Sequence, residues 1–140
     1  MNLSRLYEAD ETAWLEQMSQ LIRDRKYDRL DYEHLSEYLQ DMAQRDRREV
    51  MSRLTVLLTQ MLKWRHQPTL QSRSWEMMIG IQRDQLRDLL ESQTLRSHAV
   101  EVLPRAYVRA SKYASAETGL DEETFPQDCP FTYDEVLGSE

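Results

Sequence analysis

Eight polar and charged side chains beside the apolar stripes of the predicted helices are the residues of this chain best suited to chemistry. They are Glu37, Asp41, Gln60, Lys63, Gln67, Arg73, Gln82 and Arg83. Most lie at or near helical spacing, so helix packing could bring carboxylates, amides and cations together. Such a cluster would either line a cleft or form a buried network in which every member needs a partner.

A purely structural interpretation of the same residues is favoured. Glu37 and Asp41 would lie on a solvated helix face, and Lys63 would extend its charged end to water. Gln82 keeps a functional pocket open as an alternative, because an amide within an apolar stripe costs stability unless it is hydrogen-bonded.

Known catalytic signatures are missing from the sequence. There is no glycine-rich phosphate loop, no nucleophile elbow, no zinc-protease motif and no cysteine pair. Asp31 with His34 resembles half of a di-metal carboxylate motif, but it occurs once, so we expect a solvated helix N-terminus there. Cys129, flanked by Pro130 and Phe131, indicates a packed turn, not a nucleophile. We therefore expect no metal and no cofactor.

The net charge of −7 over 140 residues argues against wholesale binding to nucleic acid or to an anionic membrane. The charges are unevenly spread. Residues 1–43 hold 5 basic and 10 acidic side chains, residues 44–83 hold 8 and 3, and residues 84–140 hold 5 and 12. The basic middle segment could bind phosphate or pair with its acidic flanks, and the charge balance favours pairing.

The composition predicts an all-α fold. Only three glycines and four prolines occur, and three of the prolines lie at or beyond Pro104. We expect a compact bundle of about five helices in a single domain spanning residues 1–140. The tail contains Phe125, Pro126, Pro130 and Phe131, which predicts a strap laid on the bundle.

The apolar periodicity places the five helices. The first runs from about Asp10 to Lys26, and the second begins after Asp31. A break at 43–46, where no apolar side chain is larger than alanine, separates the second from a third that ends before Pro68. The fourth is capped by Ser72 or Ser74, and the fifth runs from about residue 95 to Gly119, bent at Pro104.

Four apolar stripes should be buried. They are Trp14, Met18, Leu21 and Ile22; Leu35, Tyr38 or Leu39, and Met42; Val50, Leu54, Leu57, Leu58, Met61 and Leu62; and Trp75, Met78, Ile79, Leu86, Leu89 and Leu90. Thr132 should cap a final helical turn through Leu137. The sequence has no apolar run long enough for a membrane span and no apolar stretch near its start, so we expect a soluble cytoplasmic protein.

The chain resembles the bacterial domain-of-unknown-function family 29 over nearly its whole length. The resemblance lies in Tyr7, Trp14, residues 21–23, Glu37, Asp41, Met42, Leu57, Leu58, residues 61–64, Gln67, Pro68, residues 72–75, Ile79, Gln82, Arg83, Tyr107, Ala110, residues 117–120, Phe125, Pro126, Cys129 and Pro130. It implies a compact helical protein with no established activity or cofactor. The family usually has His where Gln60 stands and more acidic residues at Ser36 and Gln40, which weakens any metal or acid/base hypothesis.

Three functions remain open from the sequence. The favoured one is a non-catalytic protein-interaction or structural module, either a homo-oligomer or an acidic partner of another protein. The second is an enzyme acting on a nucleotide or nucleic acid, with Lys63, Arg73 and Arg83 as phosphate contacts and Glu37 or Asp41 as acid/base groups. The third is a nucleic-acid-binding module that uses the basic middle segment.

Overall fold

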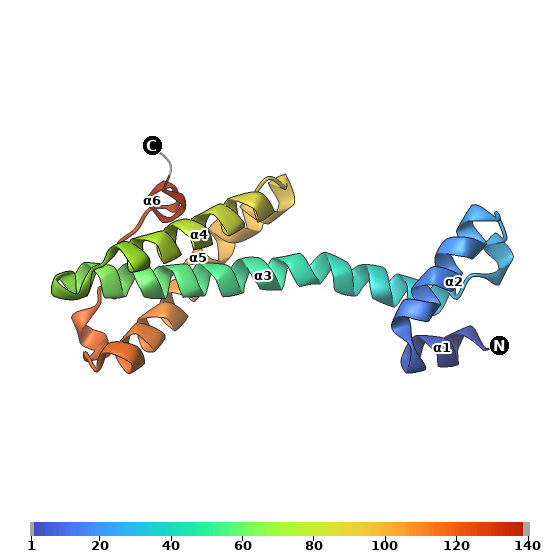
Figure 1. Cartoon of the computed structure of the whole chain (residues 1–140), viewed down its shortest axis with the longest axis horizontal. Helices are drawn as coiled ribbons and strands as arrows, with labels where there is room; N and C mark the ends of the chain where they lie inside the picture. Colours follow the sequence, from blue (N-terminus) through green and yellow to red (C-terminus); the bar gives the residue numbers. More distant parts are fainter. Residues whose placement is uncertain (1, 139–140) are drawn as a thin grey trace. The chain divides into compact units, whose positions relative to one another are not determined.

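The computed structural model describes residues 2–138, and within these residues all regular structure is helical, which confirms the predicted all-α class (Figure 1). The chain divides into an N-terminal unit, residues 1–45, and a C-terminal unit, residues 46–140. The prediction of a single domain stays a prediction. In the described part of the chain, no helix is long and apolar enough to span a membrane.

The N-terminal unit contains α1 (Leu3–Ala9), α2 (Glu11–Arg23), the 3-10 turn η1 (Tyr27–Arg29) and the start of α3 (Tyr32–His66). Asp10 caps α2 as predicted, since its side chain accepts a hydrogen bond from the backbone N–H of Ala13. The short helix α1 was not predicted, and it packs against α2 (Figure 1). Trp14 and Met18 are the two buried side chains among residues 2–45.

Two predicted stripes are only partly buried in this unit. Ile22, Leu39 and Met42 are exposed, whereas Leu21, Leu35 and Tyr38 are half-buried. The predicted burial of Ile22 and Met42 is therefore wrong, and of the two alternatives Tyr38 and Leu39, Tyr38 is the partly covered one. Apolar periodicity shows which residues share a helix face, but burial also needs another element to cover that face.

The predicted break at 43–46 is also wrong, because α3 continues through these residues from Tyr32 to His66. Ala43 and Arg45 favour helix, and neither glycine nor proline interrupts the segment. All four residues are exposed. The lack of apolar side chains marks a stretch of helix whose sides face solvent, not the end of a helix. The predicted end before Pro68 is confirmed.

The C-terminal unit is built from the second part of α3, α4 (Arg73–Leu89), α5 (Gln93–Thr118) and α6 (Tyr133–Leu137), with 3-10 turns η2 (Pro68–Leu70) and η3 (Glu122–Thr124). The predicted stripe from Val50 to Leu62 is buried as expected. It forms one core with residues that include Ile79, Leu86, Val102, Tyr107 and Val136.

Local capping signals in this unit were predicted correctly. Ser72 caps α4, Gly119 ends α5 in the left-handed conformation at φ 77°, and Thr132 opens α6 with a capping box. α5 runs through Pro104 as one helix, and a bend at that residue stays a prediction.

The tail packs on the core, as the predicted strap requires. Phe125 is buried, and the Tyr107 hydroxyl donates a hydrogen bond of 2.5 Å to the carbonyl of Pro126. The Cys129 thiol is half-buried and donates to the carbonyl of Phe131 at 3.4 Å, which agrees with the packed turn expected there.

Candidate binding surface around Lys63

Three of the eight predicted residues come together on one side of α3. Gln60, Lys63 and Gln67 line a hollow of about 350 Å³ with Met78 of α4 and Glu117 of α5. Gln60, Lys63, Met78 and Glu117 also border a neighbouring hollow of about 290 Å³, which Val56 and Tyr113 help to line. Helical spacing on α3 places the three predicted residues on one face.

The charge at the centre of these hollows is balanced. The Lys63 Nζ lies 2.9 Å from the Glu117 Oε2 and 5.5 Å from the centroid of the Trp75 ring. The Lys63 side chain is 27% exposed and the Glu117 side chain 53%, so solvent screens the ion pair and its contribution to stability is below about 1 kcal/mol. The pair therefore matters more for the charge pattern of the surface than for the fold.

Gln60 carries an unused hydrogen-bond acceptor in this region. Its Oε1 is buried and has no partner among the described atoms. The neighbouring hydroxyls of Thr55 and Thr59 instead donate to the carbonyls of Met51 and Thr55 within α3. A buried acceptor without a donor costs free energy.

Large apolar side chains surround the ion pair and remain exposed to solvent. The exposed fractions are 44% for Val56, 60% for Leu70, 52% for Met78 and 56% for Tyr113. We call these four residues, together with Gln60, Lys63 and Glu117, the Lys63 surface. The prediction that Met78 is buried is wrong, because the covered face of α4 follows Ile79 and Leu86. Met77 and Ile81 are exposed on the same helix.

The other predicted residues lie elsewhere. Glu37 and Asp41 are exposed on α3 within the N-terminal unit, and Arg73 is exposed at the first turn of α4. Gln82 is half-buried on α4 and lines neither hollow.

Arg83 holds the C-terminal helix in place. Its Nε donates to the carbonyl of Val136 at 3.0 Å and its Nη2 to that of Glu135 at 3.1 Å, while Arg87 binds the carbonyl of Leu137. Burial, together with the nearby Arg87, lowers the pKa of Arg83 from its ordinary value. These guanidinium groups bind carbonyls in the last turn of α6, where helix carbonyls lack intrahelical partners or share them.

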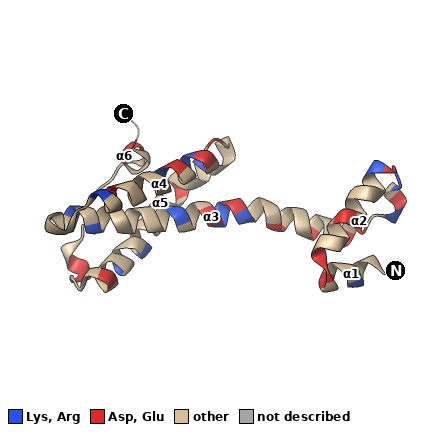
Figure 2. Ribbon diagram, viewed as in Figure 1, with Lys and Arg blue, Asp and Glu red and all other residues tan. Residues whose placement is uncertain are grey.

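The basic middle segment makes an ion pair with an acidic flank, that of Lys63 with Glu117. Arg53 pairs with Glu49 of the same segment at 2.8 Å, and Arg65 lies 5.6 Å from the centroid of the Phe131 ring. General pairing of this segment with its acidic flanks stays a prediction. Along α4, arginines are interspersed with Asp and Glu (Figure 2).

A second cluster, in the N-terminal unit, joins residues that the sequence did not connect. One oxygen of Asp31, Oδ2, lies 2.8 Å from the His34 Nδ1 and accepts a hydrogen bond of 3.2 Å from the Trp14 indole. The Tyr7 ring stacks on the His34 ring at 4.4 Å between centroids. The solvated N-terminus expected at Asp31 is wrong, since only 9% of its side chain is exposed.

Hydrogen bonds determine the direction in which the pKa values of Asp31 and His34 shift. Burial alone would raise the pKa of Asp31, but hydrogen bonds from His34 and Trp14 outweigh burial and hold that pKa below its ordinary value. The hydrogen bond to Asp31 raises the pKa of His34 against the opposing effect of burial. Within residues 2–138, no group of three or more His, Cys, Asp or Glu side chains is arranged to hold a metal ion.

Comparison with known proteins shows the family of the chain. A family model described as Domain of unknown function DUF29 matches residues 6–140. No curated protein and no solved structure matches the chain significantly.

Proposed function

The chain belongs to the DUF29 family, and we propose that it is a non-catalytic protein-interaction module that associates with a second copy of itself through the Lys63 surface. One observation carries this proposal. Four large apolar side chains, Val56, Leu70, Met78 and Tyr113, are exposed around the hollows that flank one ion pair. Contiguous exposed apolar surface of this kind is typical of protein contact sites.

The charge pattern favours a second copy as the partner. A twofold interface brings the same surface of both subunits together, so that surface must be complementary to itself. Lys63 and Glu117 are the two charged residues that line these hollows. Rotation of one copy against the other can bring Lys63 of each close to Glu117 of the other, whereas a surface of one sign would repel its copy.

One other feature of the surface supports the same contact. Met78 is flexible and polarizable, and such side chains adapt to the shape of a facing surface.

The enzyme and nucleic-acid hypotheses receive less support. Lys63 is paired with Glu117, and Arg83 is bound to the carbonyls of α6, so two of the three predicted phosphate contacts are already engaged. Arg53 is likewise paired with Glu49. A phosphate ligand would have to replace these interactions.

A charge-reversal experiment tests self-association through this surface. We expect sedimentation velocity to show that wild type dimerises as its concentration rises, and that Lys63→Glu and Glu117→Lys are each monomeric because like charges then face each other. An equimolar mixture of the two variants should form a heterodimer, because an acidic surface then meets a basic one. Circular dichroism of each variant checks that the fold is kept.

A matched pair of single variants locates the contact. Met78→Lys should abolish the dimer, whereas Val100→Lys, which changes an exposed apolar residue of α5 that lines neither hollow, should leave it intact. A wild type that is monomeric at every concentration, or variants that fail to associate when mixed, would contradict the proposal.

A further inference from the structure

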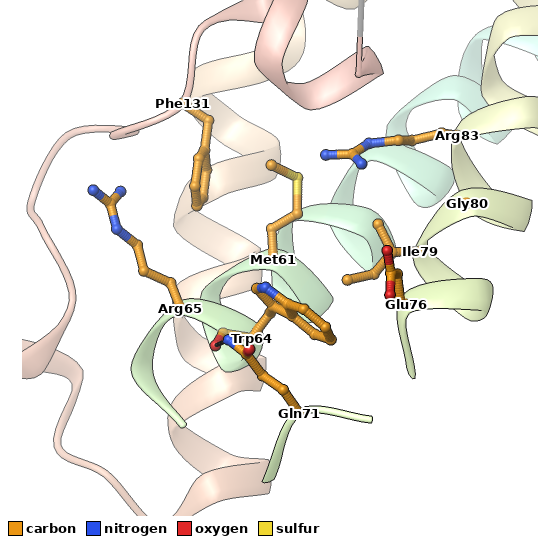
Figure 3. A pocket seen from close by; sticks show the side chains of 9 residues that line it. All are labelled: Met61, Trp64, Arg65, Gln71, Glu76, Ile79, Gly80, Arg83 and Phe131. Carbon is orange, nitrogen blue, oxygen red and sulfur yellow. Dashed lines mark hydrogen bonds between the residues drawn. The ribbon is translucent and has the colours of Figure 1, made fainter. Parts of the chain in front are cut away.

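A larger hollow lies between α3, α4 and the tail of the C-terminal unit. It encloses about 700 Å³, which is within the usual range for small-molecule pockets. Figure 3 shows the guanidinium groups of Arg65 and Arg83 at its opposite sides, with Met61 and Trp64 between them and Phe131 beside Arg65. No residue that lines it belongs to the Lys63 surface.

Gly80 forms part of the wall of this hollow and is not explained by the fold. It lies inside α4, where glycine is less favourable than any residue except proline. Its φ is not positive, and a Cβ built on it would meet no atom within 4 Å. By contrast, Gly138 has a φ of 69° and a Cβ there would lie 3.0 Å from Arg83, so backbone conformation and packing both require that glycine.

The open space beside Gly80 therefore fits a group from outside the chain that approaches the α4 backbone closely. Glycine is used where a ligand must come near the main chain, because a side chain would occupy that room. The cost of glycine in the helix is then offset when the ligand is bound.

The lining indicates the chemistry of the ligand. Trp64, Phe131, Met61 and Ile79 provide aromatic and apolar walls. Two arginines, Arg65 and Arg83, against one acid, Glu76, make the hollow net positive in a chain whose net charge is −7. The Arg65 guanidinium is exposed and lies over the Phe131 ring, and a planar guanidinium suits both aromatic stacking and two-point binding of a carboxylate.

We propose that this hollow, the Gly80 pocket, binds a small planar aromatic anion. Its ring lies against Trp64 and the bare backbone of Gly80, and its carboxylate faces Arg65. This site is separate from the Lys63 surface, so neither proposal depends on the other.

Titration of the full chain with 2-naphthoate, followed by two-dimensional ¹H–¹⁵N NMR, tests the proposal. We expect saturable shifts of the Gly80 amide and the Trp64 indole N–H. The uncharged analogue 2-naphthamide has the same rings and should bind about tenfold more weakly, because the charge-assisted hydrogen bonds are lost. Absence of these shifts with 2-naphthoate would overturn the proposal.

Substitutions at Gly80 distinguish a role of this glycine in ligand binding from a role in the stability of the fold. Gly80→Ala should raise the thermal midpoint by a few degrees while weakening 2-naphthoate binding. Gly80→Leu should abolish binding, whereas Asp88→Leu, at an exposed position of α4 outside the pocket, should leave binding unchanged. Arg65→Gln should reduce the affinity for 2-naphthoate to that for 2-naphthamide and leave the latter unchanged.

Two results at Gly80 would overturn the inference. A lower thermal midpoint for Gly80→Ala would show that the fold itself requires the glycine. Unchanged binding of 2-naphthoate by a folded Gly80→Leu variant would show that the ligand does not occupy this pocket.

Discussion

Among individual residues, Asp31 shows how one carboxylate organises its surroundings. A single oxygen of Asp31 forms hydrogen bonds with both the Trp14 indole and the His34 ring. The Tyr7 ring stacks on the His34 ring. The indole is buried and needs an acceptor, because an unpaired buried donor is costly. Asp31 therefore links the buried Trp14 side chain to the start of α3.

Replacing Asp31 tests this arrangement through the pKa of His34. Wild-type His34 should titrate above the ordinary value of 6.5, and Asp31→Asn should lower its pKa because the charged acceptor is gone. NMR titration of the His34 ring protons measures both values. Glu33→Gln removes an acid that contributes far less to the pKa of His34, so it should shift that pKa much less. Equal shifts in the two variants would contradict the assignment.

The same pair predicts how stability depends on pH. The raised pKa of His34 gives stability that is complete below about pH 6.5 and is lost as the pH rises through the folded-state pKa. The lowered pKa of Asp31 gives stability that is present above about pH 3.8 and is lost as the pH falls through its folded-state value. The interaction therefore stabilises the unit most between about pH 3.8 and about pH 6.5. Asp31→Asn should make the free energy of unfolding depend less on pH.

At the scale of elements, local signals were more predictive than long-range ones. The caps at Ser72, Gly119 and Thr132 could be predicted because a cap depends on a few adjacent residues. The apolar stripe from Val50 to Leu62 was equally clear. The exposure of Leu39 and Met78 could not be predicted, since it depends on which elements cover each helix face.

In the candidate sites too, features that depend on nearby residues were predictable and features that depend on distant residues were not. Gln60, Lys63 and Gln67 line one hollow because helical spacing alone places them together on α3. Glu117, which pairs with Lys63, lies far along the sequence on α5, and no local pattern connects the two. The role of Gly80 depends on empty space around a backbone atom, which only the folded structure reveals.

The continuity of α3 through residues 43–46 can be tested at Gln44. Because Gln44 is exposed within the helix, Gln44→Gly should destabilise the chain by about 1 kcal/mol, whereas Gln44→Ala should be neutral or slightly stabilising. Denaturant unfolding followed by circular dichroism measures both. If the segment were a loop, as the absence of apolar residues suggested, both variants would be close to neutral.

At the scale of the whole molecule, the two units differ in the size of their cores. Residues 2–45 bury Trp14 and Met18, whereas the C-terminal unit buries residues from α3, α4, α5 and α6 in one cluster. A chain of about 45 residues without a disulfide or a larger core is marginal as an independent folding unit. This contrast supports the proposal of a single folding domain in which the N-terminal unit depends on the rest.

Separate expression of the two parts tests that proposal. Residues 46–140 should unfold cooperatively, and residues 1–45 should show little helix by circular dichroism, because isolated short helices are weak in water. Intact chain serves as the reference for helix content. Cooperative unfolding of residues 1–45 alone would make the chain two domains.

The single thiol of this chain has a practical consequence. Burial raises the pKa of Cys129, so little of it is thiolate at neutral pH, and alkylating reagents attack the thiolate. A cysteine introduced at an exposed position such as Val100 should therefore react with a maleimide dye well before Cys129 does. Each charge-reversal variant can then carry its own fluorophore without removal of the native thiol, and energy transfer between the two would report their association directly.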